Sequence, residues 1–207
     1  MVRPVAPGHA SRVAPPPGSR YKDTQHERHL TAGRSEAAPP RSRLRDRPRN
    51  PYGREELYGL DIRAGLTAPG VVRIEAANLT VQPIPYPDDF FDSVSGFDFL
   101  EHVPRVVVLA DGTSIFPFVR LMDEVWRVLK PGGRFYASTP AYPHEKAFRD
   151  PTHVNVIAAK TWRYFCEPYL EGSMYGFHGR FRKLRQVRTN PDYRHVLGAF
   201  VSIYGRL

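Results

Sequence analysis

The sequence has little cysteine and no long apolar run. Its 207 residues include a single cysteine, Cys166, which excludes an internal disulfide and a zinc site built on cysteines. No stretch approaches the roughly 20 consecutive apolar residues of a membrane-spanning helix, and residues 1–14 lack the apolar core of a secretory signal. We therefore expect a cytoplasmic protein that does not enter a membrane, with Cys166 as an inert, partly buried thiol.

Acidic residues are scarce in the first quarter of the chain. Residues 1–50 hold eleven Lys and Arg against four Asp and Glu, so most of the net charge of +9 lies there. The same segment is rich in proline and has almost no apolar periodicity, so it cannot offset the entropy of ordering. We predict a disordered segment over residues 1–50 and one domain over residues 51–207. A basic RNA-binding arm is a weaker interpretation, because no aromatic residues are interleaved for base stacking.

The clearest structural pattern lies between residues 116 and 140. Leu121, Val125 and Val128 recur at helical spacing, and Pro117 is tolerated in a first helical turn. Pro131-Gly132-Gly133 ends the predicted helix over residues 116–130, and a short buried strand follows over residues 135–137. This order of elements predicts one αβ unit of a parallel sheet.

Other segments extend this unit into a larger α/β domain in which strands alternate with helical segments. Strands are predicted over residues 57–62, 71–75 and 90–96, and an antiparallel hairpin over residues 177–189 and 195–204. Smaller elements are a short helix that begins near Phe97 and bends at Pro104, a small hairpin over residues 106–113 that covers the site, and a short helix over residues 158–167.

Three motifs together resemble those of class I S-adenosylmethionine-dependent methyltransferases. They are Pro-Tyr-Pro-Asp-Asp-Phe-Phe-Asp at 85–92, Leu-Glu-His-Val at 100–103 and Leu-Lys-Pro-Gly-Gly at 129–133. The resemblance covers residues 56–140 well and the hairpin more loosely. It implies a Rossmann-like, mostly parallel sheet with a C-terminal antiparallel hairpin, S-adenosylmethionine as cofactor, and methyl transfer to an unidentified acceptor.

Ligands of doubly wound sheets bind beyond the carboxyl ends of the strands, so residues there are candidates for cofactor contacts. Asp61 closes the first predicted strand, followed by Ile62, and a carboxylate there can accept two hydrogen bonds from a ribose diol; a turn or helix cap is its alternative role. The resemblance implies that Asn78 and Leu79 contact the adenine.

Phe97 and Asp98 follow the strand that ends in Gly96. The resemblance implies that these two residues line the methionine end of the cofactor and the substrate channel.

The sequence departs from the family upstream of residue 56. The family's first strand ends in an acidic residue and a Gly-x-Gly turn, whereas residues 1–55 contain only the isolated Gly8, Gly18, Gly33 and Gly53 with no apolar strand before them. The first strand is therefore either replaced by another segment or missing from a truncated or frame-altered relative of the family. A catalytically inactive, truncated methyltransferase-like protein that acts as a binding partner is therefore the alternative function.

The loop after the strand at 135–137 concentrates polar and ionisable residues at an expected substrate position. His144 and His153 are candidate catalytic bases, and Arg149 is a candidate for holding an anionic group of the substrate. Further candidate substrate contacts are Tyr142, Asp150 and Asn155. The alternative role of these residues is structural hydrogen bonding. A third hypothesis is a metal site made of His144, Asp150 and His153. We assign no metal ligand, because three potential ligands in one loop are weak evidence.

Basic residues also gather near the C-terminus, in residues 180–188. A sheet edge protected by charge explains them better than a nucleic-acid site does. The methyl acceptor and the oligomeric state are not encoded in any pattern that we recognise.

Overall fold

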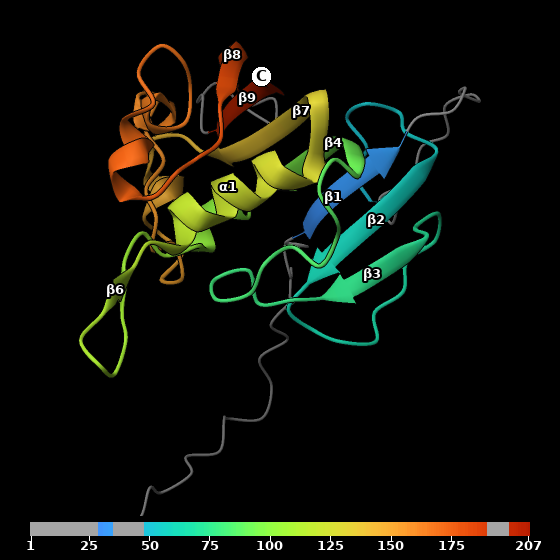
Figure 1. Cartoon of the computed structure of the whole chain (residues 1–207), viewed down its shortest axis with the longest axis horizontal. Helices are drawn as coiled ribbons and strands as arrows, with labels where there is room; N and C mark the ends of the chain where they lie inside the picture. The colour runs from blue at the N-terminus through green and yellow to red at the C-terminus, as the bar shows by residue number, and fades with distance from the viewer. Residues whose placement is uncertain (1–28, 35–47, 190–198) are drawn as a thin grey trace, which may run out of the picture.

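The computed structural model describes residues 29–34, 48–189 and 199–207, which form one large sheet with a helix on it (Figure 1). In spatial order its seven strands are β3 (Arg73–Ala76), β2 (Glu56–Asp61), β1 (His29–Arg34), β4 (Phe91–Phe97), β7 (Leu129–Pro140), β9 (Ala199–Arg206) and β8 (Phe181–Thr189). The described helices are α1 (Pro117–Val128) and the 3-10 helices η1 (Leu100–His102), η2 (Glu145–Ala147), η3 (Thr161–Tyr164) and η4 (Glu171–Tyr175). Most of the segment predicted to be disordered, and the turn at residues 190–192, lie outside the described residues.

Strand directions confirm the predicted fold class. β2 pairs with β3 and β4 with β7 in parallel, whereas β9 lies antiparallel between β7 and β8. Among the described strands of this sheet, only β1 and β9 oppose the common direction. The chain therefore has a Rossmann-like, mostly parallel sheet that a C-terminal antiparallel hairpin completes.

Another segment, β1, takes the place of the family's first strand, although no sequence pattern had identified it as a strand. β1 lies between β2 and β4 and is antiparallel to both, with Leu30 opposite Leu60 on one side and Gly96 on the other. Leu30 is 1% exposed, so this part of the N-terminal segment belongs to the domain. Because β1 is reversed, its first residue, His29, lies opposite Phe97 at the carboxyl end of β4.

The predicted αβ unit is confirmed, but the helix ends two residues earlier than predicted and the strand is longer at both ends. α1 ends at Val128 and β7 begins directly at Leu129, so the Pro-Gly-Gly turn lies within the strand. Residues 130–133 bulge opposite a single position of β4. Gly132 has φ 75°, and a Cβ atom on Gly133 would lie 2.8 Å from the Lys130 carbonyl oxygen, so both positions favour glycine.

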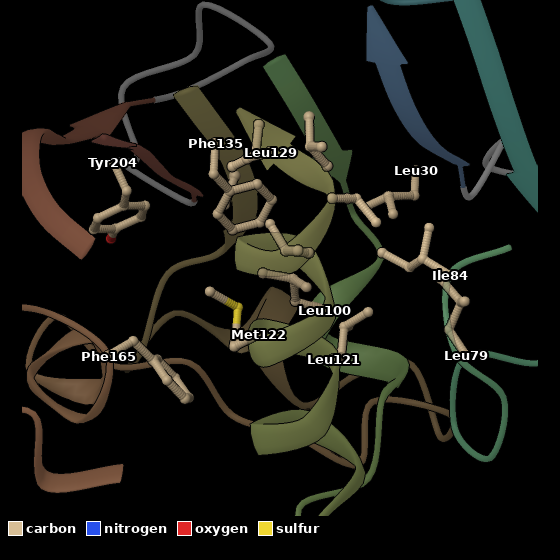
Figure 2. Packing of buried hydrophobic residues seen from close by; sticks show 14 of the residues in the cluster. Leu30, Leu79, Ile84, Leu100, Leu121, Met122, Leu129, Phe135, Phe165 and Tyr204 are labelled. Atoms are coloured by element: carbon tan, nitrogen blue, oxygen red, sulfur yellow. The ribbon is translucent and has the colours of Figure 1, made fainter. Parts of the chain in front are cut away.

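One continuous hydrophobic core fills the space between α1 and one face of the sheet (Figure 2). Figure 2 shows Leu121 and Met122 of the helix near Leu100. Towards the C-terminal strands the core becomes aromatic, with the rings of Trp162 and Tyr204 4.5 Å apart. The helix predicted over residues 158–167 is only the 3-10 helix η3, because the chain at Cys166 is drawn into a bridge with β8.

The other face of the sheet carries no helix among the described residues. Phe97 and Tyr136 alternate with core positions and so lie on this face, where their rings are 5.0 Å apart. The segment 48–54 crosses over them: the Arg49 guanidinium lies 4.9 Å from the Phe97 ring and Tyr52 lies 6.5 Å from Tyr136. Burial of its hydroxyl against the sheet raises the pKa of Tyr52 to about 12.

The predicted alternation of strands and helices is wrong for the first half of the domain. The connections at residues 62–72 and 77–90 contain no helix, since glycine and proline interrupt the first and three prolines interrupt the second. The predicted small hairpin is confirmed as β5 (Val107–Val108) and β6 (Ser114–Ile115), which extends outward in Figure 1; its role as a cover stays a prediction. None of the helices in the described ranges is long and apolar enough to cross a membrane.

Candidate functional site

Asp61 lies at the carboxyl end of β2, as predicted, and is 8% exposed. Its carboxylate is held by Arg63, whose Nε and Nη2 donate to the two oxygens at 3.0 and 3.1 Å and whose backbone N–H donates at 2.9 Å. The Arg63 side chain is 56% exposed, so it can leave the carboxylate without disturbing the core. Ile62 beside it is exposed.

Asn78 and Leu79 follow β3 on the neighbouring strand, and the Ala77 N–H donates to the Asp61 carbonyl at 2.8 Å. The Asn78 side chain closes a turn, accepting from the Thr80 N–H at 3.1 Å. Leu79 is 6% exposed and belongs to the core. The predicted contacts of both residues with adenine stay predictions.

Asp98 follows β4 in the left-handed region, with φ 47°. Such a conformation costs a non-glycine residue about 1–3 kcal/mol, and here the Asp98 N–H is fixed by the Ser138 carbonyl at 2.9 Å. The Asp98 carboxylate lies 3.8 Å from the Arg49 guanidinium, which also covers Phe97. Phe97 and Asp98 therefore lie at the carboxyl end of β4, next to the first residue of the antiparallel strand β1.

The loop after β7 is built around two short turns. His144 caps η2, and its Nδ1 accepts from the Lys146 N–H at 3.1 Å. Tyr142 and Arg149 are exposed, and the Tyr142 carbonyl accepts from Arg188 of β8 at 2.6 Å. The side chains of Tyr142 and Arg149 thus remain accessible to a substrate at this end of the sheet.

The second part of the loop is tied to η1. Asn155 is 1% exposed, and its side chain donates to the Leu100 carbonyl at 3.2 Å and accepts from Arg105 at 2.7 Å. Asp150 accepts from the Thr152 backbone N–H and hydroxyl. The Asp150 Oδ2 atom also lies 3.8 Å from Nε2 of His153.

Sequence reasoning missed two residues of this region, Glu101 and His102 of η1, which lie beside His153. One potential ligand atom from each of the three lies within 4.8 Å of the others. Adjacent Glu and His were visible in the sequence, but only as part of a family motif. Their proximity to His153 depends on the pairing of β4 with β7, which carries η1 and the loop to the same edge.

A comparison with protein families gives the identity of this fold. Residues 47–137 match the family model described as a methyltransferase domain. This part of the chain is thus similar to a methyltransferase domain. S-adenosylmethionine is the cofactor of such methyltransferase domains. A search of curated proteins gave no match.

Solved structures of methyltransferases are similar to this chain at low identity. The putative methyltransferase bound to the Trm112 activator of Haloferax volcanii is 15% identical (TM-score 0.46), and 72% of this chain aligns with 70% of that one. The YcgJ protein from Bacillus subtilis is 14% identical with a TM-score of 0.46, and 74% of this chain aligns with 83% of that chain. A putative S-adenosylmethionine-dependent methyltransferase from Listeria monocytogenes is 13% identical with a TM-score of 0.45, and 75% of this chain aligns with 82% of that chain. These similarities are too low for a role to be transferred.

The described residues of the methyltransferase domain fit part of the cofactor. Asp61 is a buried carboxylate of the kind that holds a ribose diol, and Asn78 follows the adjacent strand. No Gly-rich turn lies between β2 and β4 in the part of the chain that the structure describes, because the start of β1 occupies that edge. The fit therefore extends to the nucleoside half of S-adenosylmethionine and not to a Gly-rich cradle.

Proposed function

We propose that this methyltransferase domain binds S-adenosylmethionine along the carboxyl ends of β2, β3 and β4 and catalyses methyl transfer to an acceptor held by the loop 141–157. The observation that carries the proposal is Asp61, a nearly buried carboxylate at the end of β2 whose two oxygens accept from the half-exposed Arg63 side chain. Ligands of open α/β sheets bind at this edge. When Arg63 moves aside, both oxygens of Asp61 can accept hydrogen bonds from vicinal hydroxyls.

Catalysis in this proposal rests on positioning, with proton removal by a loop histidine at most. The methyl group passes from the cofactor sulfonium to a nucleophilic oxygen, nitrogen or carbon of the acceptor. Nδ1 of His144 already accepts from the Lys146 N–H, so this nitrogen is not free to take a proton from the acceptor. His153 has a buried Nδ1 to which no described group donates.

The test is calorimetric titration of the full chain with S-adenosylhomocysteine, which binds without turnover. We expect micromolar binding that weakens at least about tenfold in Asp61→Ala, as loss of hydrogen bonds to a charged group predicts. Arg63→Ala should bind more tightly than the parent chain, because the carboxylate no longer has to be released. Glu56→Ala, at the opposite end of the same strand, is the matched control. Absence of heat at millimolar ligand would refute the proposal.

A non-catalytic methyltransferase-like partner is the second candidate. The reversed β1 and the Asp61–Arg63 pair favour it, since both occupy the cofactor edge in the chain as described. A folded chain that fails to bind S-adenosylhomocysteine, with Arg63→Ala failing as well, would support this candidate over the first.

A further inference from the structure

Glu101, His102 and His153 form a cluster of potential metal ligands. One ligand atom from each lies within 4.8 Å of the others, and the two imidazole rings meet edge to face with their centroids 4.7 Å apart. Glu101 is 3% exposed and the His153 side chain 9%. The cluster thus joins two imidazoles and a carboxylate from segments that are distant in the sequence.

A rigid hydrogen-bonded frame holds the two segments together. The Asn155 N–H donates to the Glu101 carbonyl at 2.9 Å, and the Asn155 side chain bonds to the carbonyl of Leu100. Arg105 donates to Asn155 and to the Val156 carbonyl from the other side. These bonds hold η1 and the segment 155–156 in a fixed relative position, next to His153.

The orientation of His102 can be deduced from its partners. Its Nδ1 lies 3.1 Å from the Thr152 carbonyl oxygen and 3.0 Å from the Thr152 hydroxyl. A carbonyl can only accept, and the hydroxyl donates its proton to Asp150 at 2.6 Å, so Nδ1 of His102 must carry a proton. In the neutral ring the lone pair is then on Nε2, which is the atom that can bind a metal.

His153 shows the complementary arrangement. Its Nε2 lies 3.8 Å from Asp150 Oδ2, on the side opposite to Nδ1. Nδ1 is buried, and no group in the described ranges forms a hydrogen bond with it. Buried ring nitrogens normally have a partner, and a metal ion would supply one. Asp150 thus contacts His153 directly and His102 through Thr152, as carboxylates behind metal-binding histidines do.

We propose that Glu101, His102 and His153 bind one divalent transition-metal ion, with Zn²⁺ as the test ion. Two imidazoles and one carboxylate suit zinc and its neighbours better than magnesium or calcium, which prefer oxygen ligands. Three protein ligands leave a position open, which is typical of catalytic zinc sites rather than structural ones. In the metal-bound chain Nδ1 of His153 is occupied and is not a base for the proposed methyl transfer.

Metal binding is tested on the tag-free full chain after chelator treatment, by titration with Zn²⁺ against a chromophoric chelator. We expect one tight site per chain. His102→Gln and His153→Ala should each weaken binding about a hundredfold or more, and Asp150→Asn by about 10- to 100-fold, as removal of a group behind a ligand does. His178→Ala is the matched control, because this histidine is exposed and paired with Asp123.

Co²⁺ gives a second readout, since ligation by two imidazoles and a carboxylate produces visible absorption that both histidine variants should abolish. Thermal unfolding of the metal-free proteins checks that each variant is folded. Stoichiometric binding that neither histidine variant weakens, or no binding at micromolar Zn²⁺, would overturn the proposal. Both results are independent of S-adenosylhomocysteine binding, so failure of the metal site and failure of the proposed function are distinguishable.

Discussion

Single residues at this site take their properties from what surrounds them rather than from their type. Asp61 is a candidate for binding hydroxyls because it ends a buried strand, and its present partner, Arg63, is mostly solvent-exposed. His144 and His153 belong to one loop, yet Nδ1 of His144 accepts from the Lys146 N–H whereas Nδ1 of His153 is buried without a described hydrogen-bond partner. Residue type alone did not separate these roles.

Cys166 gives a prediction at this scale. The thiol is 4% exposed, and burial, with a smaller opposing contribution from Lys183, raises its pKa to about 12. Because the thiolate is the reactive form, the folded chain should not react with a disulfide reagent at pH 8, whereas the urea-unfolded chain should release one equivalent within minutes. Rapid modification of the native chain would contradict the burial of this residue.

Individual elements depend on contacts that link distant parts of the chain. The loop before β4 has no helix, and Arg127 of α1 holds it instead. Its guanidinium donates to the carbonyls of Ile84 and Tyr86 at 2.9 Å each and to the carboxylate of Glu124. Glu124 in turn accepts from the Ile84 N–H at 2.8 Å.

Removing this guanidinium should therefore destabilise the domain. Arg127→Ala removes the guanidinium donor of two carbonyls and leaves the largely buried Glu124 with only the Ile84 N–H of the two donors described above, and we expect a loss of about 2 kcal/mol in the free energy of unfolding, measured by urea denaturation. Arg127→Lys keeps the charge but not the forked geometry and should lose about half as much. Arg120→Ala, on the same helix, is the control and should change stability by less than about 0.5 kcal/mol.

β1 supplies a second prediction for an element. It is the central strand between β2 and β4, so a residue within it cannot lose its N–H without cost. Thr31→Pro should lower the melting temperature by about 10 °C or more, because proline removes a ladder donor and crowds the neighbouring strand. Thr31→Ala keeps the N–H and serves as control. Equal melting temperatures for the parent and the proline variant would show that β1 is not part of the sheet in solution.

At the scale of the whole molecule, the elements that could be predicted from the sequence are those specified by short-range patterns of residues. The helix and strand around the Pro-Gly-Gly turn, the acidic end of β2 and the C-terminal hairpin were all readable, since periodicity and turn residues specify them. β1 was not readable, because His29–Arg34 contains one buried leucine and no alternating pattern. The position of β1 depends on its pairing with β2 on one side and β4 on the other.

The residues of the candidate site also divide into those that local patterns predict and those that long-range contacts bring together. Asp61, Phe97 and Asp98 were found because each follows a predicted strand. The proximity of His102 and His153 could not be found in this way, because it arises from strand pairing and from the contacts of Asn155. Long-range contacts of this kind leave no periodic signal in the sequence.

We propose that the domain binds its cofactor at the carboxyl ends of β2, β3 and β4. Amide hydrogen exchange of the full chain, with and without saturating S-adenosylhomocysteine, tests where the cofactor binds. We expect protection at residues 61–63, 78–80 and 97–100, and none in the hairpin at residues 107–115. Exchange that is unchanged at all three segments at millimolar ligand, or protection confined to other segments, would contradict the claim.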